Sequence, residues 1–286
     1  MRRPIHSAAG VGLLALLLAG CRLDVLHPQG PVGVREASLI AITLGAMMVV
    51  VVPVFFMTFW FAWRYRATGD AVYRPEWARS LGVEITVWGV PLAIILFLGI
   101  LSWRSTHLLD PYRRLQVAGE PLNVEVVALD WKWLFIYPDQ HIATVNLLEI
   151  PADRQIDFLI TSDTVMNAFF IPQLGTQIYA MAGMQTQLHL LAKNPGVYRG
   201  ISANFSGPGF ADMRFSTNAV AQGVFSAWVR QVQAAPHALN AASYAALARP
   251  SSDNPVAFFG SVAPDFFERI AMRQAGAVRM VAGQAP

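Results

Sequence analysis

The stretch SLIAITLGAMMVVVVPVFFMTFWFAW, from Ser38 to Trp63, contains no charged residue, and a second uncharged stretch, ITVWGVPLAIILFLGILSW, runs from Ile85 to Trp103. A helix of about 20 apolar residues crosses the hydrocarbon core of a membrane. The sequence therefore predicts two transmembrane helices, at about residues 38–65 and 82–104. The composition agrees, because 14% of the 286 residues are charged, against about 25% in an average soluble protein.

The residues before the first helix have the pattern of a bacterial secretion signal. Two arginines precede a short apolar run, Val11–Ala19, which is the order of a signal peptide. The segment Leu17–Cys21 resembles the lipobox of lipoproteins, in which the cysteine receives a lipid. Cys21 is the only cysteine, so an internal disulfide is excluded. We expect residues 1–20 to be a lipoprotein signal peptide and residues 21–110 to be a lipid-anchored hairpin.

The lipid anchor also predicts the orientation of the chain. With Cys21 outside, the link between the two helices is cytoplasmic. The chain then spans the inner membrane of a bacterium, and everything after about Asp110 lies in the periplasm. Arginines are about equally common on both sides, so charge bias does not decide the orientation. One carboxylate, Glu84, stands at the start of the second helix. It has two interpretations, an interfacial anchor or a residue of a proton pathway.

After the second helix the periodicity changes to that of strands. Apolar residues alternate in Leu122–Leu129, Ile156–Ile160 and Gln185–Leu190, with turn signals between them. Short strands at this spacing indicate a β-sandwich or Greek-key barrel of about 100 residues, which we assign to residues 111–222. Residues 223–286 have aromatic side chains at helical spacing and are predicted to form a short C-terminal helical arm.

A signal, a two-helix hairpin and an outer β-domain, in that order, resemble subunit II of the heme-copper oxidases. The resemblance rests on Glu84 followed by Pro91, on Asp130-Trp131-Lys132-Trp133, and on the longer segments Ser162–Gly175 and Ser202–Met213. The C-terminal segment resembles the aromatic-rich arm of the quinol oxidases, and the pattern is most similar to the cytochrome bo type. The implied fold is an α+β membrane protein with a cupredoxin-like periplasmic domain.

The departures from the family pattern concern its copper centre, CuA. In cytochrome c oxidases this dinuclear centre uses two bridging thiolates, two imidazoles, a thioether and a backbone carbonyl. By resemblance, the corresponding positions here are Asn167 and Phe210 for the histidines, Ser202 and Ser206 for the cysteines, Asn204 for the glutamate, and the retained Met213. Hydroxyl, amide and phenyl groups are poor ligands for copper, which prefers soft thiolates. We therefore expect no metal in this domain.

The resemblance implies a non-catalytic subunit of a proton-pumping terminal oxidase that oxidises ubiquinol and reduces oxygen to water. Hemes and copper belong to partner subunit I, and lipid on Cys21 is the only group expected on this chain. Further expected partners are subunit III, a small subunit IV, membrane lipid and quinol, but not cytochrome c. Assembly and the entrance of the K proton pathway at Glu84 are the implied contributions. Residues that bind quinol are not identified.

Three other interpretations remain open at this point. The chain could be a cytochrome c oxidase subunit with unusual copper ligation, a free-standing cupredoxin-like scaffold lipoprotein, or a subunit of a menaquinol oxidase. Copper in the outer domain would favour the first, and purification without heme would favour the second. Nucleic-acid binding has no support, because the net charge is only +3 and no basic block is present.

Overall fold

The computed structural model describes residues 24–66, 69, 80–115, 117 and 119–282. Two long apolar helices come first, α2 (Pro31–Arg64) and α3 (Leu81–Leu108), after a single 3-10 turn, η1 (Asp24–Leu26). Both are long and apolar enough to cross a membrane. The predicted signal peptide (1–20) and Cys21 lie outside the described residues.

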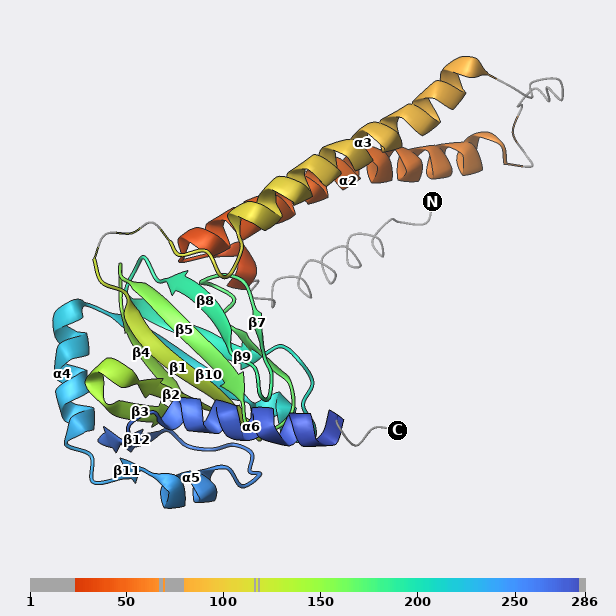
Figure 1. The fold of residues 1–286 in the computed structure, drawn as a ribbon. Helices are drawn as coiled ribbons and strands as arrows, with labels where there is room; N and C mark the ends of the chain where they lie inside the picture. Colours follow the sequence, from red (N-terminus) through yellow and green to blue (C-terminus); the bar gives the residue numbers. More distant parts are fainter. Residues whose placement is uncertain (1–23, 67–68, 70–79, 116, 118, 283–286) are drawn as a thin grey trace, which may run out of the picture.

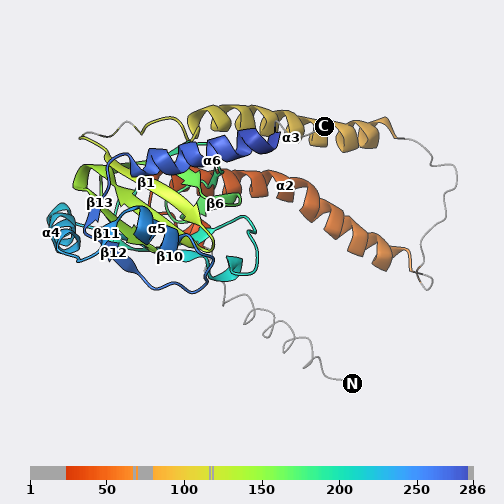
Figure 2. The same ribbon diagram turned by 60° about the horizontal axis from the view of Figure 1, so that its bottom comes forward.

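The helices of the hairpin exceed the predicted spans at the end nearest the β-domain. Helix α2 begins at Pro31 instead of residue 38, and α3 ends at Leu108 instead of residue 104. The 34 residues of α2 span about 50 Å at 1.5 Å per residue, which is more than the hydrocarbon core requires. Pro53 lies inside α2, and the helix bends along its length (Figure 2), as helices do at proline.

Between Leu122 and Val220 the chain folds mainly into two facing sheets, one of which also takes a strand from the C-terminal arm. The strands are β1 (Leu122–Leu129), β2 (Lys132–Tyr137), β3 (Ile142–Val145), β4 (Leu147–Pro151), β5 (Gln155–Ser162), β6 (Asn167–Phe170), β7 (Ile178–Ala180), β8 (Thr186–Leu191), β9 (Gly196–Ser202), β10 (Arg214–Val220) and β12 (Ala257–Phe259). One sheet has the order β12-β3-β2-β1-β5-β8, and the other has the order β4-β10-β9-β6-β7. The predicted strands and sandwich are confirmed.

The core between the sheets follows from the alternation of side chains along each strand. On β1, Val124 and Val126 point inward, where they join Phe158 of β5 in the main cluster. The rings of Phe169 and Phe215, from the second sheet, stack in this core with centroids 5.2 Å apart. On the other face of β1, Val127 and Leu129 are also buried, so this end of the strand is covered by another part of the chain.

The C-terminal arm provides that cover. Its helices are α4 (Gln222–Gln233), α5 (Ala241–Leu247) and α6 (Phe266–Ala282), and a two-stranded sheet joins β11 (Ala238–Leu239) to β13 (Ser261–Val262). Helix α6 runs across the outer face of the six-stranded sheet (Figure 1). The arm is not only helical, because its strand β12 pairs with β3 and extends that sheet. Three-residue strands leave no periodicity for the sequence to reveal.

The start of α2 is docked on the β-domain. The backbone N–H of Gln29 donates to the Gln173 carbonyl (2.7 Å), and the N–H of Lys193 donates to the Gln29 carbonyl (2.9 Å). Gly30 follows in a position where a Cβ would lie 2.5 Å from the Leu191 carbonyl oxygen. The hairpin is therefore attached to the β-domain by direct backbone contact as well as through the link after α3.

Candidate functional site

The positions singled out by the sequence meet at one end of the sandwich. Asn167 begins β6 and Ser202 ends β9, two strands that pair antiparallel. The loop after β9 contains the 3-10 turn η3 (Phe210–Asp212) and returns to β10. We call this end the pole, defined by Asn167, Ser202, Asn204, Ser206, Phe210 and Met213.

One half of the pole is a closed hydrogen-bond network. Ser202 Oγ donates to Asn167 Oδ1 at 3.0 Å and lies 3.3 Å from the Asn204 carbonyl oxygen. Asn167 Nδ2 donates to the carbonyl of Val165 at 3.1 Å. Asn167 and Ser202 are 1% and 5% exposed, and buried polar groups are stable when they are hydrogen-bonded in this way. These side chains satisfy one another.

The other half of the pole is largely apolar. Met213 is buried, and its Sδ lies 3.9 Å from Ser206 Oγ. The ring of Phe210 packs edge-on against Phe205, with centroids 5.6 Å apart. Phe205 itself is 75% exposed. A phenyl group thus occupies the position at which the family resemblance would place an imidazole.

Trp131 fixes the loop that closes the pole. Its Nε1 donates to the Ser206 carbonyl at 3.0 Å. Gly209 passes so close to the indole that a Cβ there would lie 2.4 Å from Trp131 Cδ2. Gly207 has φ +111°, a conformation that glycine adopts at no steric cost. The loop is therefore shaped by its glycines and by a tryptophan from the turn between β1 and β2.

The residues present at the pole do not fit a dinuclear copper centre. They offer one thioether, two hydroxyls and two amides, while copper of this kind requires thiolate sulfur. A serine hydroxyl stays protonated near neutral pH, and the Ser202 hydroxyl and Asn167 amide already bond to each other. The two histidines of the domain lie elsewhere. His141 is exposed after β2, and His189 on β8 bonds through Nδ1 to Asp157 Oδ1 at 2.8 Å.

Glu84 lies far from the pole. It is in the first turn of α3, where its backbone N–H donates to the Ser80 carbonyl at 3.0 Å, and its side chain is exposed. This end of α3 is the end of the hairpin away from the β-domain (Figure 1).

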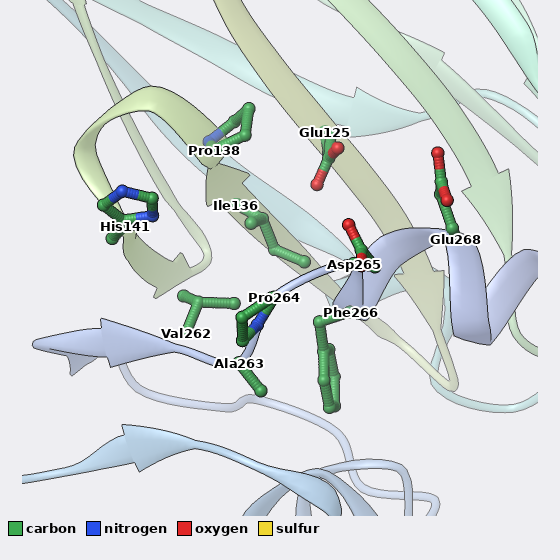
Figure 3. Close-up of a pocket in the computed structure, with 10 residues that line it drawn as sticks. All are labelled: Glu125, Ile136, Pro138, His141, Val262, Ala263, Pro264, Asp265, Phe266 and Glu268. Atoms are coloured by element: carbon green, nitrogen blue, oxygen red, sulfur yellow. The ribbon is translucent and has the colours of Figure 1, made fainter.

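The structure also joins charged residues that the sequence analysis did not single out. Asp163 follows β5, is 7% exposed, and accepts hydrogen bonds from Arg273 Nη2 (2.5 Å) and Gln274 Nε2 (2.9 Å) of α6. Glu125 lines a pocket with Asp265 and Glu268 from the start of α6 (Figure 3). The only signal for Glu125 is a carboxylate two residues before Val127 and Leu129, the apolar residues on the same face of β1. Nothing local connects Asp163 to a helix that far along the chain.

Comparisons with known proteins match nearly the whole chain. The family model described as "Cytochrome C oxidase subunit II, periplasmic domain" matches residues 134–220, and the model described as "COX Aromatic Rich Motif" matches residues 233–277. The ubiquinol oxidase subunit 2 of Acetobacter aceti is 56% identical over 259 residues, which are 90% of this chain and 84% of that protein.

Two further relatives show the same pattern at lower identity. The cytochrome bo(3) ubiquinol oxidase subunit 2 of Pseudomonas putida is 51% identical over 262 residues, covering 91% of this chain and 83% of that protein. The quinol oxidase subunit 2 of Bacillus subtilis is 36% identical over 249 residues, covering 86% of this chain and 78% of that protein.

Proposed function

The chain belongs to the family of subunit II of the heme-copper quinol oxidases, and from this premise we propose how it serves such an oxidase. Relatives more than half identical to it are named ubiquinol oxidase subunits, so it is a subunit of an oxidase of this kind. The two apolar helices and the family place it in the inner membrane with its β-domain in the periplasm. The cytochrome c oxidase and free-standing scaffold interpretations are not favoured.

The proposed role is non-catalytic. By family resemblance, electrons pass from ubiquinol to hemes and copper in subunit I, where oxygen is reduced to water and protons are pumped. The observation that carries this proposal is the donor set of the pole, where a hydroxyl, an amide and a phenyl replace sulfur and imidazole. Such a pole provides no route for an electron from a soluble cytochrome. The domain then serves assembly and covers the periplasmic face of subunit I.

Glu84 is proposed to lie at the entrance of the K proton pathway. Support comes from its exposed carboxylate in the first turn of α3, at the end of the hairpin away from the β-domain. With the β-domain in the periplasm, that end faces the cytoplasm, from which protons are drawn. Carboxylates within membrane segments commonly act as proton relays.

The remaining proposals concern attachment and partners. Lipid on Cys21 would add a second membrane anchor to the two helices. Partner subunits III and IV follow from the family resemblance, and ubiquinol is proposed as the substrate because the relatives that are more than half identical are named ubiquinol oxidase subunits. Removing the thiol in Cys21→Ala is expected to abolish labelling by a radioactive fatty acid, while the hairpin keeps the chain in the membrane fraction.

One purification tests the proposed function. The tagged full-length chain is extracted in mild detergent, and heme spectra and oxygen uptake are recorded. We expect heme to co-purify and oxygen uptake to depend on ubiquinol and not on reduced cytochrome c. A heme-free chain, or cytochrome c oxidation through copper in the β-domain, would overturn the proposal.

A further inference from the structure

The C-terminal arm meets the outer face of the six-stranded sheet along β1. On this face of β1, Val127 and Leu129 are buried against Phe267 and Ile270 of α6. Glu125 is the next residue in the same row, because side chains two apart on a strand share a face. Its cross-strand neighbours are Ile136 on β2 and Leu159 on β5. A half-buried carboxylate therefore lies between the buried apolar end of this row and the exposed Asn123, and it has no basic cross-strand partner.

The arm brings further carboxylates to the same place. Asp265 immediately precedes α6 and Glu268 lies in its first turn, and both line the pocket into which Glu125 points (Figure 3). Asp139, in the 3-10 turn η2 (Pro138–Gln140), adds a fourth acidic group nearby. We call Glu125, Asp139, Asp265 and Glu268 the carboxylate cluster. Two of its members come from the sheet side of the interface and two from the arm.

The cations around the cluster are occupied elsewhere or lie at its edge. Arg114 pairs with Asp157 (Nε to Oδ2, 3.5 Å) and its side chain is 74% exposed. His189 also bonds to Asp157. Arg269 Nη2 donates to the Pro264 carbonyl at 2.9 Å. His141 lines the far side of the pocket. Among the described residues, no cation forms an ion pair with Glu125.

We propose that the carboxylate cluster makes docking of the C-terminal arm depend on pH, with the arm held more tightly when Glu125 carries a proton. A protonated Glu125 is neutral and suits the apolar row beneath the arm. An ionised Glu125 places a charge against Asp265 and Glu268, and like charges at short range repel.

The direction of the pH dependence follows from where Glu125 binds its proton. In the docked state burial raises the pKa of Glu125 to about 7, and the charges of Glu268, Asp139 and Asp265 add to the rise. When the arm leaves, part of the burial and two of these charges are removed, and the pKa falls back toward its ordinary value of 4.5. The docked state therefore holds the extra proton between these pH values. Docking weakens as pH rises through that window and is constant above it.

Hydrogen–deuterium exchange on the purified full-length chain in its membrane complex tests the proposal. Exchange of peptides from α6 is followed between pH 5 and pH 8, corrected for the intrinsic rate and compared with peptides from β9 and β10. We expect protection of α6 to fall up to about tenfold per pH unit below neutral, the limit for one coupled proton, and to be level above pH 7. The β9 and β10 peptides should show no such change.

Three variants show whether Glu125 or another titratable group nearby causes the pH dependence. Glu125→Gln is isosteric and cannot ionise, so protection of α6 should stay level over the whole range. Glu120→Gln, which removes an exposed charge just before the same strand, and His141→Gln should both keep the dependence of the unmodified chain. An unchanged pH dependence in Glu125→Gln, or its loss in His141→Gln alone, would overturn the proposal.

Discussion

Lys132, one of two lysines in the chain, is 1% exposed. Its Nζ donates to the carbonyls of Leu247 (2.9 Å) and Arg249 (2.8 Å) and to Ser251 Oγ (2.6 Å). Burial lowers the pKa of Lys132, and the nearby charge of Asp130 opposes the shift. A buried ammonium is tolerated when all its donors are used. Here the acceptors lie at and after the C-terminus of α5, where helix carbonyls lack partners.

Replacing this ammonium should loosen the arm. Lys132→Met keeps the length of the side chain but leaves two carbonyls without donors, at about 1–3 kcal/mol each. We expect the free energy of unfolding to fall by about 3 kcal/mol and chymotrypsin to cut faster after Tyr244, which is buried while the arm is docked. Lys193→Met, at an exposed position, is the matched control. Equal behaviour of the two variants would show that the three bonds to Lys132 contribute nothing.

At Glu84 the prediction concerns turnover instead of stability. Glu84→Gln removes the ionisable group but keeps the size of an exposed side chain. If the carboxylate passes protons, ubiquinol-dependent oxygen uptake should fall about tenfold or more, while heme content and subunit composition stay unchanged. Glu84→Asp should retain part of the rate. Full turnover in Glu84→Gln would leave Glu84 as an interfacial anchor.

At the scale of elements, the contact between the hairpin and the β-domain includes a close approach of backbone at Gly30. A Cβ at Gly30 would lie 2.5 Å from the Leu191 carbonyl oxygen and 2.7 Å from that of Leu174. Neither atom can move without shifting backbone. The start of α2 thus has a steric requirement that its apolar composition does not express, because the neighbours come from strands and loops far along the chain.

Adding one methyl group at this point should detach the helix start. We expect Gly30→Ala to lower the free energy of unfolding by about 2 kcal/mol, the usual cost of overpacking. Thermal denaturation of the detergent-solubilised complex measures the change. Gly45→Ala is the control, since a Cβ at Gly45 in the same helix meets nothing within 4 Å. Comparable melting of both variants would argue against a tight docking.

For the whole molecule, elements with a clear period were predictable from the sequence. Uncharged runs gave both helices, and alternation gave β1, β5 and β8. The short strand β12 (Ala257–Phe259) was missed because pairing with β3, not local pattern, makes it a strand. The positions of the pole were identified by their motifs, but the bond between Ser202 and Asn167 is a tertiary contact. The role of Asp163 depends on α6 and has no local signal.

The backbone around the pole still holds the positions of the copper ligands close together, although the ligands themselves are replaced. This allows one prediction about the molecule as a whole. Strands β6 and β9, with the loop held on Trp131, already bring Asn167 and Ser202 within 3.0 Å of each other and Ser206 near Met213. The combined variant Asn167→His, Ser202→Cys, Asn204→Glu, Ser206→Cys and Phe210→His would provide the thiolates and imidazoles that copper requires. We expect it to bind copper with strong visible absorption from thiolate ligation.

Metal analysis and the visible spectrum of the purified variant measure this outcome. A control with Asn167→His and Phe210→His alone keeps the serines, so it should lack the thiolate absorption. The full variant could fold, as judged by circular dichroism, and still take up no copper. In that case the backbone of the loop no longer has the geometry that a copper-binding domain requires. If it binds copper, the side chains alone prevent the unmodified domain from binding the metal. The backbone that positions these side chains is held by Trp131 and by the pairing of β6 with β9.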